Sequence, residues 1–384
     1  MIFEFATATR ILFGRGKVKE VVPAASALGQ RAFMVTGGSP ARVLSLVDDL
    51  GKQDVECTLF SVSGEPSISQ IEEGVRAAKE MRCELVIAFG GGSVLDAGKA
   101  IAALMTNPGP LALYLEIVGS GQPLGNPCAP CICIPTTSGT GSEVTRNAVL
   151  TSPEHRVKVS LRSPRMLPTL AVIDPGLTDS LPPAITATTG LDALTQLIEP
   201  FVCNSKNPLT DAVSRDGIGR VAHWLPLACK EGANAEAREN MALASLFGGM
   251  ALANAKLGVI HGLAGTLGGM FPIPHGIICA RLLPIGMHAN LRALRTRSKD
   301  SPALRAYEQI ARVVTGRPSA EAEEGIEWIR HLCSNLCVPR LSSFGVTEED
   351  LPAVAAQAQQ SGSIKGNPVT LTVEELTAIL TEAL

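Results

Sequence analysis

The side chains best suited to chemistry in this sequence are an aspartate and two histidines in its second half. Asp192 lies in a run with helical periodicity, and Gln196 shares its helix face about 6 Å further along the axis. His261 and His275 lie in a stretch, residues 257–280, that contains no Asp, Glu, Lys or Arg. Two imidazoles and a carboxylate in weakly charged surroundings are suitable ligands for a divalent transition metal. The alternative is that each histidine is a hydrogen-bonded core residue.

A second group of candidate functional residues is rich in glycine. Residues 84–89 form an apolar run typical of a strand, and a Gly-Gly-Gly-Ser sequence at residues 90–93 follows it and opens a helical run. Glycine lets a phosphate approach the backbone closely, and a helix N-terminus presents N–H groups and the positive end of the helix dipole. We therefore expect Gly91, Gly92 and Ser93 to bind the pyrophosphate of a dinucleotide. A plain strand–helix turn is the alternative.

The next predicted strand, residues 131–135, leads into a loop dense in hydroxyl groups and glycine at residues 136–143. Neutral hydrogen bonds from such a loop can hold ribose and phosphate oxygens. Clusters of Ser, Thr and Gly also form ordinary loops, but this one follows a neighbouring strand end. We interpret Thr136, Thr137 and Thr140 as further cofactor contacts.

Two different frameworks must position these candidate residues. Up to about residue 181, short apolar runs that end in turns alternate with helical stretches, which is typical of a parallel sheet with crossover helices. The predicted strands cover residues 32–36, 84–89, 131–135 and 170–173. After residue 181 we find no convincing strand, and predicted helices cover residues 185–202, 209–230, 235–254, 303–314, 320–336, 348–359 and 373–384.

We thus predict an α/β fold with a Rossmann-like dinucleotide-binding domain over residues 1–181. An all-helical domain that carries the metal and catalytic residues follows over residues 182–384. A length of 384 residues agrees with two domains, since domains usually have about 100–200 residues. Within the second domain, we interpret residues 257–280 as backbone buried inside a soluble protein, because their glycines, prolines and histidines do not suit a lipid-facing helix.

The composition excludes several functions. Hydrophobic residues make up 46 % and charged residues 18 %, whereas a disordered chain needs the opposite balance. A formal net charge of −3 without a long Lys/Arg run argues against binding to nucleic acid or an anionic membrane. The N-terminus does not have the pattern of a signal peptide, and 10 cysteines are too sparse for a disulfide scaffold. We therefore expect a cytoplasmic protein with a small-molecule substrate.

Four motifs in order along the chain resemble those of the iron-dependent (group III) alcohol dehydrogenases. They are Gly-Gly-Gly-Ser-x-x-Asp-x-x-Lys at residues 90–99, Pro-Thr-Thr-x-Gly-Thr-Gly-Ser-Glu at residues 135–143, Gly-Leu-Asp-Ala-Leu at residues 190–194 and Pro-His-Gly at residues 274–276. The similarity spans nearly the whole chain. The resemblance implies a nicotinamide-binding domain joined to a helical metal domain, and a homo-oligomer of two or more chains.

The resemblance also implies a ligand set for Fe²⁺ or Zn²⁺. The family's metal ligands fall on Asp192, Gln196, His261 and His275. The family normally has histidine at position 196, and the amide of Gln196 is a weaker ligand than a neutral imidazole. A further family histidine is replaced by Gly265, and an asparagine of the family by Cys279. The departures therefore cluster at the metal site, while the cofactor loops are intact.

For the cofactor, the resemblance adds contacts at Thr145, Asn147 and Lys158. Family members that prefer NAD usually carry an aspartate after the strand that ends at Thr36, where its carboxylate holds the ribose and repels a 2′-phosphate. This chain has Gly37 there, followed closely by Ser39. The missing charge slightly favours NADP over NAD, with Ser39 or Arg42 as the phosphate contact.

The implied activity is that of an NAD(P)-dependent alcohol dehydrogenase or aldehyde reductase. Its metal polarises the alcohol or carbonyl oxygen for hydride transfer, with Asp192, His261 and His275 as the catalytic residues. One alternative is a metal-independent reductase that resembles the maleylacetate reductases. Another is a nucleotide-binding relative with impaired catalysis, which the altered metal site would explain.

Overall fold

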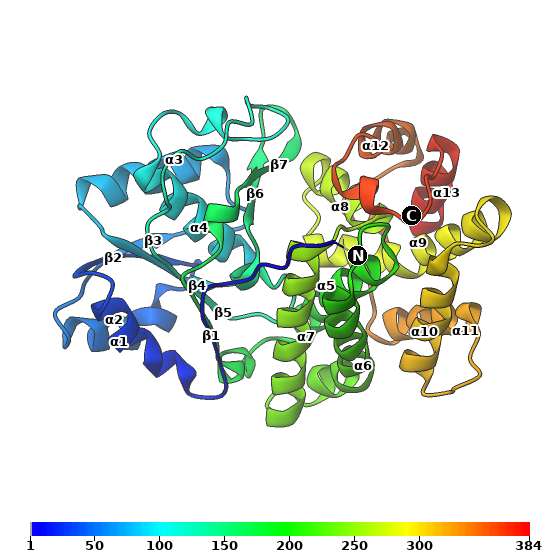
Figure 1. The fold of residues 1–384 in the computed structure, drawn as a ribbon, viewed down its shortest axis with the longest axis horizontal. Helices are drawn as coiled ribbons and strands as arrows, with labels where there is room; N and C mark the ends of the chain where they lie inside the picture. Colours follow the sequence, from blue (N-terminus) through cyan, green and yellow to red (C-terminus); the bar gives the residue numbers. More distant parts are fainter. Residues whose placement is uncertain (1) are drawn as a thin grey trace. The chain divides into compact units, whose positions relative to one another are not determined.

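The computed structural model describes residues 2–384, which fall into two compact units (Figure 1). Thr7–Thr137 and Gly141–Asp179 make up one, which we call the α/β unit. Ser180–Leu384, with residues 2–6 and Ser138–Thr140, make up the other, which we call the helical unit. The last point at which the chain passes from one unit to the other lies between Asp179 and Ser180.

A six-stranded sheet forms the centre of the α/β unit, with strand order β1-β8-β5-β4-β2-β3 and every neighbouring pair parallel. Its strands are β1 (Ile11–Phe13), β2 (Arg31–Thr36), β3 (Glu56–Ser61), β4 (Leu85–Gly90), β5 (Cys131–Pro135) and β8 (Leu170–Ile173). Every residue of β4, β5 and β8 is buried. Such continuous apolar runs are what a parallel sheet covered on both faces requires.

Helices cover both faces of this sheet (Figure 1). Ala32 and Met34 of β2 point to one face of the sheet and pack with α1 (Val21–Ser26) and α2 (Leu44–Gly51). Phe33 and Val35 point to the opposite face and pack with α3 (Ile68–Glu80) and α4 (Gly92–Thr106). This alternation follows from the two-residue period of a strand. An antiparallel hairpin of β6 (Asn147–Ser152) and β7 (Val157–Arg162) completes the unit.

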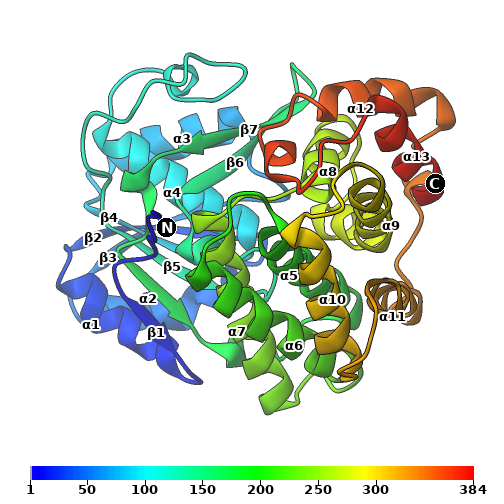
Figure 2. The same ribbon diagram turned by 45° about the vertical axis from the view of Figure 1, so that its right-hand side comes forward.

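The helical unit contains a bundle of α-helices, seen from a second side in Figure 2. They are α5 (Pro183–Val202), α6 (Pro208–Lys230), α7 (Ala235–Asn254), α8 (Val259–Met270), α9 (His275–Arg297), α10 (Pro302–Thr315), α11 (Ala322–Asn335), α12 (Leu351–Ala358) and α13 (Val373–Ala383). A single apolar core joins these helices. The predicted fold class, a Rossmann-like α/β domain followed by an all-helical domain, is confirmed.

Several elements differ from the sequence-based predictions. Strands β1, β3 and β6 and helices α1 and α2 were not predicted, because their residues are short runs with mixed exposure. Residues 257–280, interpreted as buried backbone without a predicted helix, contain α8 and the start of α9. The helix-breaking prolines lie between the two helices, where Pro274 precedes the first residue of α9.

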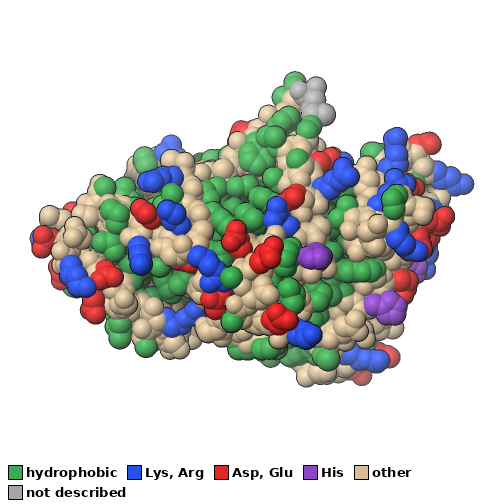
Figure 3. All heavy atoms as spheres, turned by 90° about the horizontal axis from the view of Figure 1, so that it is seen from below, with side chains coloured by type: hydrophobic (Ala, Val, Ile, Leu, Met, Phe, Trp, Pro, Cys, Tyr) green, Lys and Arg blue, Asp and Glu red, His purple; other side chains and the backbone are tan. Residues whose placement is uncertain are grey.

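Within residues 2–384, no single helix is long and apolar enough to cross a membrane. Helices α7 and α8 together meet the criteria of length and composition, but they meet at a bend of 95°. The face of the molecule drawn in Figure 3 carries Lys and Arg side chains interspersed with Asp and Glu. This face therefore offers no extended surface of one charge.

Candidate metal centre and nucleotide-binding loops

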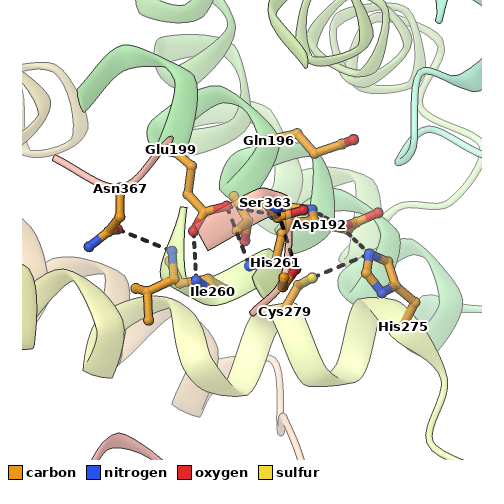
Figure 4. Close-up of polar contacts among 12 residues, drawn as sticks. Asp192, Gln196, Glu199, Ile260, His261, His275, Cys279, Ser363 and Asn367 are labelled. Atoms are coloured by element: carbon orange, nitrogen blue, oxygen red, sulfur yellow. Dashed lines mark hydrogen bonds and ion pairs between the residues drawn. The ribbon is translucent and has the colours of Figure 1, made fainter. Parts of the chain in front are cut away.

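Four side chains of the helical unit converge on one point (Figure 4). Asp192 comes from α5, His261 from α8, and His275 and Cys279 from α9, and their ligating atoms all lie within 4.8 Å of one another. Asp192 Oδ1 lies 3.6 Å from His261 Nε2 and 3.7 Å from His275 Nε2. Cys279 Sγ lies 3.5 Å from His275 Nε2. The structure thus brings together Asp192, His261 and His275, and it adds Cys279.

Two atoms of this cluster are buried without a hydrogen-bond partner among the described residues. They are Asp192 Oδ1 and His261 Nε2, in side chains that are only 3 % and 7 % exposed as residues. An unsatisfied buried polar atom destabilises a fold by about 1–3 kcal/mol, so it usually has a functional explanation. A carboxylate oxygen, two imidazole nitrogens and a sulfur are donors that divalent transition metals accept. These residues therefore fit a metal ion.

Glu199 orients His261 within the cluster. It lies about two helical turns after Asp192 on α5, so both carboxylates share one helix face. Glu199 Oε2 lies 2.7 Å from His261 Nδ1, and its Oε1 accepts a hydrogen bond of 2.7 Å from Ile260 N. Because a carboxylate can only accept, Nδ1 carries a proton, and in the neutral ring Nε2 has the free lone pair that a metal would bind.

The cluster shifts the pKa values of its own members. Burial alone would raise the pKa of Asp192, but the nearby His275 and His261 lower it below its usual value. Burial would likewise lower the pKa of His261, but Cys279, Asp192 and Glu199 together raise it. Burial raises the pKa of the Cys279 thiol to about 12. In the absence of a metal, the thiol is therefore protonated at neutral pH.

The predicted ligand Gln196 makes a different contact. Its side chain is buried, and Nε2 donates a hydrogen bond of 2.8 Å to the carbonyl oxygen of Gly139. In Figure 4 its side chain lies apart from those of His261 and Cys279. Gly265, where the family resemblance implies a histidine, has open space around it, since an added Cβ would have no neighbour within 4 Å.

The predicted pyrophosphate site lies where β4 meets α4. Gly91 is the N-cap of α4, and no side chain of the described residues caps it. A Cβ on Gly90 would lie 2.6 Å from the side chain of Val94, so the tight turn requires glycine there. A Cβ on Gly91 would lie 3.4 Å from Thr137 Oγ1, which brings the hydroxyl-rich loop beside the turn. The first N–H groups of α4, at Gly92 and Ser93, are suitable anion-binding groups.

The hydroxyl-rich loop is tied to α4 by a buried lysine. Lys99 Nζ donates hydrogen bonds of 2.9 Å to Ser142 O, 2.8 Å to Thr145 Oγ1 and 2.5 Å to Asn147 O. It also forms an ion pair of 3.2 Å with Asp96 Oδ1. Lys99 thus positions the loop, and the hydroxyl of Thr145, a predicted cofactor contact, is engaged inside the protein.

Other predicted cofactor contacts also have partners in the α/β unit. Lys158 Nζ, on β7, lies 2.6 Å from Glu65 Oε1. Arg42 Nη2 donates a hydrogen bond of 2.9 Å to Leu177 O. Ser39 is exposed, and Gly37 is half-buried with only Val94 Cγ2 near the position of a Cβ, at 4.0 Å.

Glu143, at the end of the same loop, is a buried acid. Burial raises the pKa of its carboxyl group to about 7, although the positive charge of Lys99 opposes this shift. No sequence motif signals this behaviour, because it depends on the depth of the side chain. The carboxyl group is partly protonated at neutral pH.

The chain thus combines a doubly wound α/β unit, with glycine and hydroxyl loops at adjacent strand ends, and a helical unit with a metal-suited cluster. Residues 8–175 match the family model described as iron-containing alcohol dehydrogenase. Residues 186–384 match the C-terminal model of the Fe-containing alcohol dehydrogenase family. The chain belongs to this iron-containing alcohol dehydrogenase family, and it is an oxidoreductase that acts on CH–OH groups.

Individual relatives agree with this assignment. The chain is 34 % identical to the 1,3-propanediol dehydrogenase of Klebsiella pneumoniae, over 100 % of this chain and 99 % of the relative. It is 30 % identical to the NAD-dependent methanol dehydrogenase of Bacillus methanolicus, over 97 % of each. A crystal structure of a 1,3-propanediol oxidoreductase superimposes with a TM-score of 0.92 at 34 % identity, over 100 % of both chains.

Two residues of the cluster region were not predicted as functional. Glu199 and Asp192 are spaced by two helical turns, and Cys279 follows His275 by one turn, so both pairs share a helix face. The first spacing was visible in a predicted helix. The second was hidden, because residues 257–280 were not predicted to be helical.

Proposed function

We propose that the protein is an NAD(P)-dependent alcohol dehydrogenase or aldehyde reductase that uses a divalent metal held by Asp192, His261 and His275. The observation that carries this proposal is the pair of buried, unpartnered atoms Asp192 Oδ1 and His261 Nε2, 3.6 Å apart. When bound, the metal supplies a Lewis acid that polarises the alcohol or carbonyl oxygen. The family assignment supports the same chemistry.

The residues of the chain have separate tasks in this proposal. Glu199 keeps the proton of His261 on Nδ1, so that Nε2 stays available as a ligand. Burial of Asp192, His261 and Cys279 limits the access of bulk water to the cluster. Because Gly265 offers no side chain to accept a proton, the alcohol proton leaves through water or a ribose hydroxyl of the cofactor.

We propose that the turn after β4 and the hydroxyl-rich loop after β5 bind the nicotinamide cofactor. The N–H groups of Gly92 and Ser93 hold its pyrophosphate, and Thr136, Thr137 and Thr140 contact the rest of the molecule. The proposal slightly favours NADP, since Gly37 places no carboxylate near the ribose and Ser39 is exposed beside it. NAD is the alternative cofactor, because one relative is named as an NAD-dependent methanol dehydrogenase.

Metal analysis together with activity tests this proposal. The protein is purified anaerobically, its metal content is measured, and oxidation of NADPH and NADH is followed over a panel of aldehydes. We expect about one divalent ion per chain, and Asp192→Asn should lose most of the metal and at least about a hundredfold in kcat/KM. Full activity of metal-free protein would contradict the metal mechanism.

The relatives do not favour the alternative of a metal-independent reductase. That alternative requires activity that survives a chelator, which the same assay measures. Binding of the cofactor without turnover of any carbonyl would instead support a relative with impaired catalysis. A homo-oligomer stays a prediction, to be measured by light scattering of the purified chain.

A further inference from the structure

We propose that Cys279 is the fourth protein ligand of the metal, in place of the imidazole that the family resemblance puts at position 196. The resulting ligands are one carboxylate, two imidazoles and one thiolate. With the thiolate, the centre prefers Zn²⁺ to Fe²⁺ more strongly than a centre with only oxygen and nitrogen ligands would. This inference rests on the proposed function in one respect only, that a metal occupies the cluster.

The spacing of the donor atoms supports four-coordinate binding. Zinc lies about 2.0–2.2 Å from nitrogen or oxygen ligands and about 2.3 Å from sulfur, so the edges of its tetrahedron are about 3.3–3.7 Å long. Asp192 Oδ1 lies 3.6 Å from His261 Nε2 and 3.7 Å from His275 Nε2. His275 Nε2 lies 3.5 Å from Cys279 Sγ. The other pairs of donor atoms lie within 4.8 Å of one another, so a separation at that limit has to shorten by about 1 Å when four ligands close around one ion.

The helix geometry places the thiol where a ligand is needed. Cys279 follows His275 by one turn of α9, so both side chains project from the same face toward Asp192. Cys279 is completely buried, and its Sγ belongs to the same group of donor atoms as Asp192 and the two histidines. The buried, unpartnered atoms Asp192 Oδ1 and His261 Nε2 point to an ion independently of the cysteine.

Gln196 does not compete well for this role. Its amide nitrogen donates to Gly139 O at 2.8 Å, so the amide is already held by a buried carbonyl oxygen that is not part of the cluster. A thiolate is also a stronger ligand than an amide for a borderline-soft ion such as Zn²⁺. A simple S–H···N hydrogen bond from Cys279 to His275 would also explain their 3.5 Å separation, but it would leave Asp192 Oδ1 and His261 Nε2 unsatisfied.

Cobalt substitution of the full chain tests the inference directly. Metal-free protein is titrated with Co²⁺ under nitrogen, and bound cobalt is quantified together with its absorption spectrum. A thiolate bound to Co²⁺ produces intense charge-transfer absorption in the near ultraviolet, which oxygen and nitrogen ligands do not. We expect one Co²⁺ per chain and this absorption, and we expect both Cys279→Ser and Cys279→Asn to lose the absorption.

The control is Cys229→Ser, which removes a half-buried thiol from α6 outside the cluster. It should keep the absorption unchanged. Stoichiometric Co²⁺ binding by the unaltered chain without the charge-transfer absorption would overturn the role of Cys279 and leave the proposed function intact. Absorption that persists in both Cys279 variants would also overturn it. Absence of any bound metal would instead contradict the proposed function.

Metal preference provides a second readout. The metal-free chain and Cys279→Ser are each dialysed anaerobically against equal concentrations of Zn²⁺ and Fe²⁺, and the bound metals are measured. Zn²⁺ binds more tightly than Fe²⁺ to most sites, so the comparison between the two proteins is decisive. We expect the ratio of bound zinc to iron to fall at least about tenfold in Cys279→Ser. An unchanged ratio would contradict the inferred preference.

Discussion

Glu199 determines which nitrogen of His261 faces the metal centre. Its carboxylate accepts from Nδ1, so Glu199→Gln removes a charged acceptor and offers an amide N–H group in part of its place. We expect the dissociation constant for Zn²⁺ to rise about 10–100-fold, with the chain still folded. Competition with a chromophoric chelator measures this constant. Unchanged affinity would mean that His261 keeps its orientation without Glu199.

The cofactor preference can be changed at one residue. Gly37→Asp introduces a carboxylate after β2 at a position with space for a side chain, since the nearest atom to an added Cβ is 4.0 Å away. Repulsion of a 2′-phosphate should raise KM for NADPH relative to KM for NADH by at least about tenfold. Gly37→Asn, which has the same shape without the charge, is the control. An equal effect of both variants would contradict an electrostatic origin.

Glu143 makes stability depend on pH. Its pKa is about 7 in the folded protein and 4.5 as a free side chain, so the folded state keeps a proton that the unfolded state releases between these values. The free energy of unfolding therefore falls as pH rises from about 4.5 to 7, by about 3 kcal/mol at most. Glu143→Gln should remove this component. Denaturant unfolding of both proteins at several pH values measures the difference, and parallel pH profiles would contradict it.

At the residue scale, the sequence was sufficient to predict three of the four residues that form the cluster. Asp192, His261 and His275 were predicted together, and they do converge. The contact of Gln196 with Gly139 could not be predicted, because it joins residues far apart in the chain. The proximity of Cys279 depends on a helix that the glycines and prolines of residues 257–280 concealed.

At the scale of elements, helix α4 holds the hydroxyl-rich loop through Lys99. Its ammonium group is completely buried, with three hydrogen bonds to the segment that connects β5 with β6. Lys99→Met leaves Asp96 and two carbonyl oxygens without this partner. We expect the α/β unit to lose about 3–5 kcal/mol of unfolding free energy, measured with denaturant.

Lys79→Met is the matched control for this prediction. Lys79 lies on the exposed side of α3, and its replacement should change the unfolding free energy by no more than about 0.5 kcal/mol. Equal effects of the two substitutions would show that Lys99 has no special structural role. Lys99→Met should also bind the cofactor more weakly, because the hydroxyl-rich loop would no longer be fixed.

Predictions of individual elements were correct where a run of residues was long or continuously apolar. The run at residues 235–254 is α7 with the same bounds, and β5 and β8 also match. Strand β1 has only Ile11–Phe13 and is half-buried, so its sequence carries little signal. Pairing with β8 supplies the hydrogen bonds that define it, and that pairing is not local in sequence.

At the scale of the whole molecule, the two units should respond to different ligands. A metal that binds only the folded helical unit adds RT ln(1 + [L]/Kd) to its stability, about 4 kcal/mol when the ligand is at a thousand times Kd. In calorimetry, added Zn²⁺ should therefore raise the unfolding temperature of the helical unit, whereas NADP⁺ should raise the unfolding temperature of the α/β unit. A chelator should reverse the first effect and not the second.

Composition and motif order were sufficient for the division into an α/β and a helical part. They could not reveal that Ser138–Thr140, within the hydroxyl-rich loop, group with the helical unit. Thr189 explains part of this grouping, since a Cβ on Gly139 would lie 2.9 Å from its side chain. Such close packing between distant segments has no signature in a local pattern.

Three of the four donors, His261, His275 and Cys279, lie within residues 261–279, and only Asp192 is distant in the chain. Closing so short a loop loses little entropy, so an unfolded polypeptide can still chelate an ion with this segment. Zinc should then raise the free energy of unfolding by less than its affinity for the native protein alone would predict. A newly synthesised chain could likewise acquire its ion before the bundle is complete.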